Sequence, residues 1–168
     1  MRVLGIDPGT ATTGYGVVEE ASGELRALTF GAIKTPAKQP LPVRLQSIYR
    51  GVQDLVKEWD PAEAAVEELF FSRNVRTAMS VGQARGVALL ALANASLSIA
   101  EYTPLTIKQA VTGYGSADKA QIQEMVRLLL KLDQIPRPDD AADALAVAIC
   151  HLNSRRLTAL PGEREDTL

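Results

Sequence analysis

Four acidic residues occur at positions where packing alone gives no reason for a charge. Asp7 and Glu67 each end a short apolar run, and Asp140 and Asp143 stand three residues apart in a segment with helical periodicity. Side chains three apart on a helix project from one face. Carboxylates that converge from separate elements repel one another unless a cation lies between them, and oxygen-only ligands suit Mg²⁺ or Mn²⁺. The four residues therefore predict metal-dependent phosphoryl chemistry.

The spacing of apolar residues predicts the elements that must carry these side chains. Three runs rich in β-branched residues, separated by Pro8-Gly9-Thr10 and by Ser22-Gly23, predict an antiparallel three-stranded meander. Segments with helical spacing then alternate with two shorter strand-like runs. The expected strands are 2–7, 15–20, 25–35, 64–67 and 99–103, and the expected helices are 45–59, 75–97, 104–111, 120–132 and 141–152.

This order of elements predicts an α/β fold with a mixed five-stranded sheet flanked by helices. Right-handed crossovers place the fourth strand next to the first. Asp7 and Glu67 would then lie side by side at strand ends, where α/β folds build sites. The last helix can lay the face that carries Asp140 and Asp143 over the same edge. Apolar and small side chains occur nearly all the way round helix 75–97. We therefore expect this helix to be buried on more than one side, within the domain or against a second subunit.

Length and composition are compatible with one domain over 1–156, followed by a polar tail, 157–168, that we expect to be disordered. No stretch of the 168 residues is long and apolar enough to span a membrane, and because the sequence opens directly into a strand we expect no signal peptide. Cys150 is the only cysteine, which excludes an intrachain disulfide and fits a reducing compartment. A cytoplasmic location is therefore expected. His151, the only histidine, is expected to be structural or to interact with the helix C-terminus.

The net charge of −2 conceals an uneven distribution. Between residues 70 and 131, seven basic residues stand against three acidic ones. A positive surface beside a negative pit suits an enzyme that cleaves phosphodiesters, because the basic part follows the DNA backbone while cations fill the pit. The counts alone favour ordinary solvated helix charge, so the choice depends on the motifs.

Five groups of motifs follow one another along the chain, and together they resemble the RuvC family of bacterial Holliday-junction resolvases. Each motif is common by itself, but the combination is specific and covers nearly the whole chain. Glu68 departs from the family pattern, in which a neutral side chain often stands at that place. The motifs are Gly5-Ile6-Asp7-Pro8-Gly9 with Thr13-Gly14-Tyr15-Gly16, Val66-Glu67-Glu68-Leu69-Phe70, Gly82-Gln83-Ala84-Arg85-Gly86-Val87-Ala88, Gly113-Tyr114-Gly115-Ser116-Ala117-Asp118-Lys119, and Asp140-Ala141-Ala142-Asp143-Ala144-Leu145-Ala146.

The resemblance implies an RNase H-like nuclease domain that acts as a homodimer and makes paired nicks in opposed strands of a four-way DNA junction. It implies that Asp7, Glu67, Asp140 and Asp143 bind the catalytic metal. We expect two Mg²⁺ ions, replaceable by Mn²⁺, and hydrolysis that leaves 5′-phosphate and 3′-hydroxyl ends. The resemblance further implies cooperation with the branch-migration proteins RuvA and RuvB.

Several residues outside the carboxylate set are expected to contact DNA. The resemblance assigns Lys108 and Lys119 to this role, and Lys119 would also offset negative charge that develops at the scissile phosphate. It makes Phe70 the aromatic that faces the junction, although the sequence itself does not decide between Phe70 and Phe71 as the ring that stacks on an opened base. The expected DNA-binding set is completed by Arg73, Asn74 and Arg76.

The acidic residues have plainer alternatives. Asp7 could simply initiate the turn that follows it, and Asp140 and Asp143 could be acids favoured by the helix dipole. Glu67 has the weakest such alternative, because a charge at the end of an apolar strand gains nothing from packing. The combination favours metal binding, and Asp139 is expected to cap the helix instead of its neighbours.

Two other functional classes compete with the nuclease. The segment Asp7-Pro8-Gly9-Thr10 also resembles the first phosphate motif of actin/hexokinase-like ATPases, so a nucleotide-dependent phosphotransferase is the enzymatic alternative. Such enzymes need a second, duplicated domain, which 168 residues cannot supply, and no P-loop is present. A non-catalytic junction-binding module is the other alternative, which the intact set of four acids disfavours.

Overall fold

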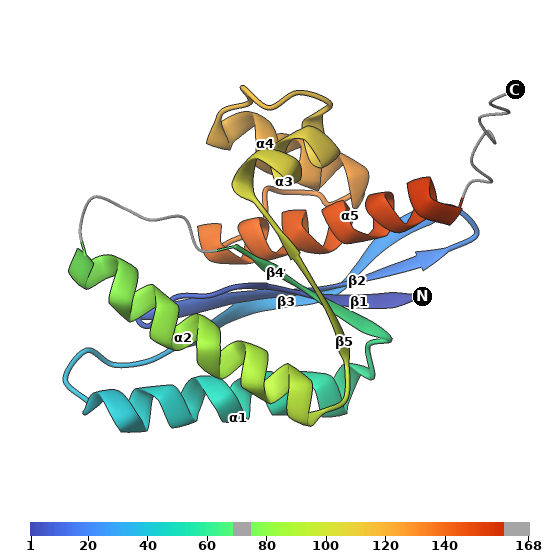
Figure 1. The fold of residues 1–168 in the computed structure, drawn as a ribbon. Coiled ribbons are helices and arrows are strands. Elements are labelled where there is room, and N and C mark those ends of the chain that lie inside the picture. Colours follow the sequence, from blue (N-terminus) through green and yellow to red (C-terminus); the bar gives the residue numbers. More distant parts are fainter. Residues whose placement is uncertain (69–74, 160–168) are drawn as a thin grey trace, which may run out of the picture.

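The computed structural model describes residues 1–68 and 75–159, which form a mixed five-stranded sheet with helices on both faces (Figure 1). The first three strands are antiparallel neighbours, whereas β4 pairs in parallel with β1 and with β5. The predicted meander and the predicted place of the fourth strand beside the first are therefore confirmed. The strands are β1 (Arg2–Asp7), β2 (Thr12–Ala21), β3 (Glu24–Lys34), β4 (Glu63–Glu67) and β5 (Ser98–Tyr102), in the order β3-β2-β1-β4-β5.

One helical layer covers each face of the sheet (Figure 1). On one face lie α1 (Leu41–Trp59) and α2 (Val75–Asn94). On the other lies α5 (Asp139–Ala159), against which α3 (Pro104–Thr112) and α4 (Lys119–Leu129) pack from outside. Within the two described ranges, no helix is both long and apolar enough to cross a bilayer.

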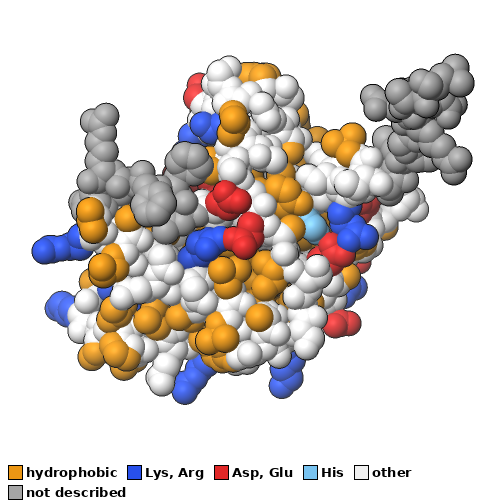
Figure 2. Space-filling view, in the orientation of Figure 1, with side chains coloured by type: hydrophobic (Ala, Val, Ile, Leu, Met, Phe, Trp, Pro, Cys, Tyr) orange, Lys and Arg blue, Asp and Glu red, His pale blue; other side chains and the backbone are white. Residues whose placement is uncertain are grey.

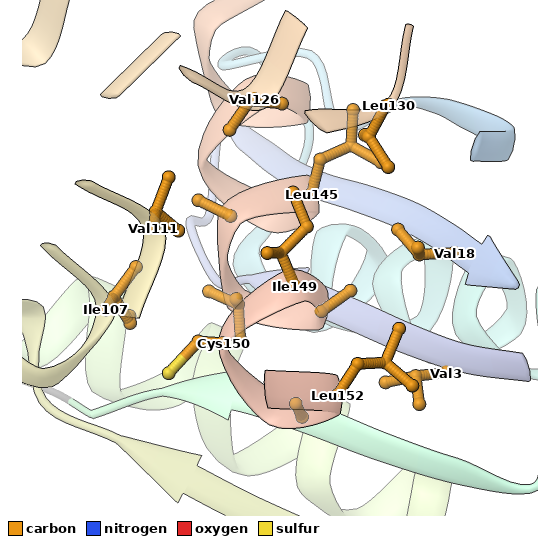
Figure 3. Packing of buried hydrophobic residues seen from close by; sticks show 14 residues of the cluster. Val3, Val18, Ile107, Val111, Val126, Leu130, Leu145, Ile149, Cys150 and Leu152 are labelled. Atoms are coloured by element: carbon orange, nitrogen blue, oxygen red, sulfur yellow. The ribbon is translucent and has the colours of Figure 1, made fainter. Parts of the chain in front are cut away.

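Side chains of the sheet alternate between two separate cores, because successive residues of a strand point to opposite faces. In β1, Val3 belongs to the core shared with α3, α4 and α5, while Leu4 belongs to the core shared with α1 and α2. Leu145 and Ile149 of α5 lie in the middle of the first core (Figure 3). The long helix α5 is thus buried against the sheet along most of its length.

The same alternation decides where the two strand-ending acids point. In β1, the side chain of Asp7 points to the same face of the sheet as that of Val3, four residues earlier. In β4, Glu67 points to the same face as Ala65, two residues earlier. Val3 and Ala65 both belong to the core beneath α5. The side chains of Asp7 and Glu67 therefore face α5, which carries the other two predicted ligands.

Glycines allow α5 to lie very close to β1 and β2. A Cβ at Gly5 would overlap the main-chain oxygen of Ala144, and one at Gly14 would overlap that of Asp140. Gly14 pairs with Asp7 across the β1–β2 ladder. The first turn of α5 is therefore seated directly over the end of β1, where Asp7 is located.

The boundaries of α5 differ from those expected. The helix begins at Asp139, so this residue lies inside the first turn, and its carboxylate accepts hydrogen bonds from Gln123 and Arg137. The prediction that Asp139 caps the helix is therefore wrong. The helix also continues to Ala159, so residues 157–159 of the expected tail are helical, and residues 160–168 lie outside the described part of the chain.

Candidate active site

The four predicted ligands meet at one edge of the sheet. Asp7 ends β1 and Glu67 ends β4, and these strands are neighbours in a parallel ladder. Asp140 and Asp143 lie in the first turns of α5. The charges of Glu67, Asp143 and Asp140 all act on the carboxyl group of Asp7. The structure thus brings together, from three elements, the side chains that the sequence singled out.

Burial and mutual repulsion raise the pKa values of the clustered acids. The pKa of Asp7 rises to about 8, first because the carboxyl is buried and then because Glu67, Asp143 and Asp140 are close to it. Burial is also the largest cause of the raised pKa of Glu67 and of Asp143. The protonated Asp7 donates a hydrogen bond to Glu67. Without a cation, the cluster therefore retains a proton near neutral pH.

The donor chemistry of the cluster fits a hard divalent cation. In the arrangement of residues 1–68 and 75–159, no three His, Cys, Asp or Glu side chains already close around an ion position. Asp7 and Glu67 are hydrogen-bonded to each other, and Asp143 is paired with Lys119. A cation would replace these contacts, because all four acids offer oxygen ligands and the positive charge would remove the repulsion that raises the pKa of Asp7. The residues present therefore fit Mg²⁺ or Mn²⁺.

A hollow beside the cluster joins two of the acids to two lysines that were predicted to contact DNA. It is lined by Glu67 and Asp143 together with Lys108 of α3 and Lys119 of α4, and its volume is about 220 Å³. We call it the lysine hollow. Its other lining residues are Pro104, Ile107, Ile122 and Ala146.

Lys119 is held against the carboxylate cluster. Its Nζ lies 3.2 Å from Oδ2 of Asp143 and 3.7 Å from Oδ2 of Asp139. Burial lowers the pKa of Lys119, but the negative charges around it outweigh this effect, so the net shift is upward. A capping box between Asp118 and Gln121 fixes the start of α4 and thereby the position of Lys119, its first residue.

A second hollow lies beside Asp140, and the sequence did not predict it. Its volume is about 510 Å³, and we call it the arginine groove. Arg76, which was predicted to bind DNA, lines it. The two hollows share no lining residue, and they border different acids of the cluster, each with basic side chains in its lining. The full lining consists of Gly9, Thr10, Ala11, Thr12, Arg44, Arg76, Thr77, Ser80, Val81 and Asp140.

Arg85 of α2 reaches the main chain of a predicted ligand. Its Nε donates to the carbonyl oxygen of Glu67 at 3.3 Å, and its guanidinium forms an ion pair with Glu101 of β5. Arg85 belongs to one of the sequence motifs, but the motif does not reveal this role because both partners are distant in the chain. The contacts tie the end of β4 to α2 and to the edge strand.

His151 lies further along α5 than Asp143 and has the structural role expected for it. Its Nδ1 is 2.8 Å from the hydroxyl oxygen of Tyr102, and its Nε2 is 2.6 Å from Oε2 of Glu63. Arg155 also pairs with Glu63. The side chain of His151 is 7% exposed, so these bonds join α5 to β4 and β5 within the protein.

Three residues that were predicted to contact DNA, Phe70, Arg73 and Asn74, lie outside the residues that the structure describes. The described chain stops one residue after Glu67 and resumes at Val75. The roles of these three residues stay predictions, and so does the choice between Phe70 and Phe71.

Comparison with known proteins gives a consistent result. Residues 3–151 match the family model described as crossover junction endodeoxyribonuclease RuvC. A relative of that name from Syntrophomonas wolfei is 57% identical, and the match covers 95% of this chain and 92% of the relative. Another, from Chloroflexus aurantiacus, is 63% identical over 90% of this chain and 92% of the relative.

A solved structure extends the comparison to the fold. The structure of T. thermophilus RuvC in complex with a Holliday junction substrate is similar to this chain, with a TM-score of 0.89 and 38% sequence identity. The match covers 94% of this chain and 96% of that chain. The fold is RNase H-like, as the motifs implied.

Proposed function

The chain belongs to the RuvC family of crossover junction endodeoxyribonucleases, and we propose on that basis that it resolves four-way DNA junctions by paired, symmetric nicks. One observation carries the proposal: Asp7, Glu67, Asp140 and Asp143 form a half-buried acid cluster bordered by cationic hollows. Such a cluster repels DNA until cations neutralise it, and the flanking positive charge attracts the DNA backbone. The setting of this activity would be DNA recombination and repair.

The four acids would hold two Mg²⁺ ions, for which Mn²⁺ could substitute. When bound, the ions supply Lewis-acid stabilisation of the phosphate and an activated water. Asp7 would be a central ligand, because Glu67 of the neighbouring strand and both acids of α5 act on its carboxyl group. The raised pKa of Asp7 supports this role, since a carboxyl that ionises reluctantly alone gains most from a bound cation.

Lys119 would act on the phosphate. Its Nζ is already at the edge of the cluster, 3.2 Å from Asp143, and it shares the lysine hollow with Lys108. A phosphate bound there would compete with Asp143 for the ammonium group. The charge of Lys119 would then offset the negative charge that develops during cleavage, and the products would carry 5′-phosphate and 3′-hydroxyl ends.

A second copy of the chain would cover the outer face of α2. Val75, Met79 and Leu90 on this helix are 74%, 63% and 54% exposed. Gly86 lies on the same helix, and a Cβ added there would meet nothing within 4 Å. Figure 2 shows hydrophobic side chains gathered over this part of the surface. A two-fold dimer would supply one active site to each of two opposed strands.

The proposal extends to residues and partners beyond the described structure. Phe70 would stack on a base at the open centre of the junction. Arg73 and Asn74 would follow the backbone, together with Arg76 of the described helix α2. The branch-migration proteins RuvA and RuvB are the proposed partners in the cell.

A nicking assay on a synthetic four-way junction tests the proposal. We expect symmetric nicks in opposed strands with Mg²⁺, no cleavage in EDTA, and little cleavage of a linear duplex with the same arm sequence. Asp7→Asn serves as the inactive control. Equal rates on the junction and the duplex would contradict junction resolution, and undiminished cleavage in EDTA would contradict the role of the acids.

A further inference from the structure

The turn after β1 lines the arginine groove, and hydrogen bonds fasten it to two neighbouring elements. The turn after β1 is fastened to α2, because Thr10 Oγ1 lies 2.6 Å from the carbonyl oxygen of Ser80 and 2.7 Å from its Oγ. The same turn is fastened to the end of β3, because Thr35 Oγ1 donates to the carbonyl oxygen of Thr10. Thr10 and Thr35 are both buried. The wall of the groove is therefore a fixed surface that includes the turn following Asp7.

Arg44 of α1 is oriented by this wall. Its Nε donates to Thr35 Oγ1 at 2.8 Å, and the side chain is half-buried. Thr35 is neutral, and Arg44 forms no ion pair with any carboxylate among residues 1–68 and 75–159. The positive charge of Arg44 is thus directed by a buried hydroxyl and is not neutralised by a described acid.

The chemistry of the groove matches a phosphodiester. A guanidinium group binds phosphate through paired N–H donors in a fixed geometry, and hydroxyl and main-chain donors are frequent partners of DNA phosphates. The groove offers Arg44 and Arg76 from two helices, and the hydroxyl-bearing side chain of Thr12 also lines it. It reaches the carboxylate cluster at Asp140, whereas the lysine hollow reaches it at Asp143 and Glu67. A strand bound over the cluster can therefore meet positive side chains on both sides of the cut.

We propose that the arginine groove binds one phosphodiester of the nicked strand, on the other side of the cut from Lys108 and Lys119, and that Arg44 contacts it. The inference rests on the proposed function, because this phosphate belongs to the strand held over the acid cluster. It adds a residue of α1, a helix that contains none of the sequence motifs. A strand held at two points cannot slide along the cluster, so the two contacts together place the scissile phosphate.

Junction binding in EDTA over a series of salt concentrations tests the contact. Arg44→Gln should weaken binding by roughly 5- to 10-fold and flatten the slope of log affinity against log salt by about one. Arg50→Gln is the matched control, because it removes the same charge from an exposed position on the same helix. Equal losses in both variants would overturn the inference, since only the net charge would then matter.

Single neutral phosphates locate the contact. Methylphosphonates are placed one at a time at the phosphates on either side of the cut, and each junction is bound to the wild type and to Arg44→Gln. At one position, the neutral phosphate should weaken binding by the wild type and leave the variant unaffected. If at every position the loss of affinity from the methylphosphonate and the loss from Arg44→Gln simply add, the inference is overturned. A wild-type protein that binds no junction at all would contradict the proposed function instead.

Melting temperatures monitor folding, because Arg44 also bonds Thr35. If Arg44→Gln does not fold at the assay temperature, Arg44→Lys takes its place in the same cycle. Lysine keeps the charge and loses the paired donors. The loss of affinity caused by the methylphosphonate at the contacted position should then be at least threefold smaller in Arg44→Lys than in the wild type. An equal loss in both proteins would overturn the assignment of Arg44.

Discussion

Gly14 and Asp140 are in direct contact between β2 and α5. A Cβ added to Gly14 would overlap the main-chain oxygen of Asp140 and lie 2.9 Å from the Cβ of that residue. Gly14 is also the partner of Asp7 in the β1–β2 ladder. The missing side chain at this strand position therefore allows the helix that carries Asp140 to come down onto Asp7.

Gly14→Ala should lower stability and weaken metal binding together. The added methyl group has to push α5 away from β2, and overpacking of this kind typically costs about 1–3 kcal/mol. Thermal melting and a Mn²⁺ titration measure the two effects. Gly86→Ala is the control, because a Cβ there meets nothing within 4 Å, and it should leave Mn²⁺ affinity unchanged. Wild-type Mn²⁺ affinity in Gly14→Ala would show that the seating of α5 does not govern the site.

Asp7→Asn, Glu67→Gln and Asp143→Asn should each abolish nicking and leave junction binding in EDTA unchanged or tighter. Each change removes a carboxylate from a site that phosphates approach, so repulsion falls while the metal ligand is lost. Nicking with Mg²⁺ and gel shifts in EDTA separate the two effects, and melting temperatures verify folding. Loss of junction binding together with loss of nicking would mean that the carboxylates have a structural role and not a catalytic one.

The metal-free protein should lose stability through Asp7 as the pH rises from about 4 to about 8. The pKa of Asp7 is about 8 in the folded protein against an ordinary value of 3.8, so the folded state keeps a proton that the unfolded state has released. Stability then falls with rising pH, by at most about 1.4 kcal/mol per pH unit. The difference in melting temperature between the wild type and Asp7→Asn in EDTA isolates this effect. A difference that is constant with pH would contradict it, and Mg²⁺ should reduce the slope.

His151→Ala should destabilise the protein without changing its chemistry. The substitution removes a hydrogen-bond partner from Glu63, whose side chain is 16% exposed, and hydrogen bonds to charged groups contribute about 1.5–3 kcal/mol. The melting temperature should fall, while the nicking rate well below it should equal that of the wild type. Leu157→Ala changes a residue of the same helix that is 72% exposed and should affect neither quantity. A slower rate at unchanged stability would assign His151 to the active site.

Met79→Asp should produce a monomer near 18.0 kDa that no longer makes paired nicks. A carboxylate at the centre of an apolar interface is costly to bury, and two-fold symmetry would place it in both subunits. Leu128→Asp is the matched control, because it puts the same charge on α4 at a residue that is 51% exposed. Sedimentation at micromolar concentration reports the state of each variant. A dimer in Met79→Asp would show that the outer face of α2 is not the interface.

The sequence alone predicted which acids would converge, because that inference needs only local pattern and chain topology. Asp7 and Glu67 each end an apolar strand, and right-handed crossovers leave β4 beside β1 in the sheet. Residues three apart lie on one face of any α-helix, so the spacing of Asp140 and Asp143 places both on the same face of α5. The meander and the place of the fourth strand beside the first follow from the same signals, whereas the resemblance to the family rests on the five groups of motifs.

Tertiary structure decided the contacts that depend on how closely these elements are seated. Thr10 and Ser80 bond although they are 70 residues apart, and Arg85 reaches the carbonyl oxygen of Glu67 from another layer of the fold. Arg44 lies outside every motif, and its bond to Thr35 helps to place it beside the site. The proton on Asp7 likewise depends on burial and on three neighbouring charges. No residue type or spacing along the chain encodes such distances, because they are set only when helices and sheet pack together.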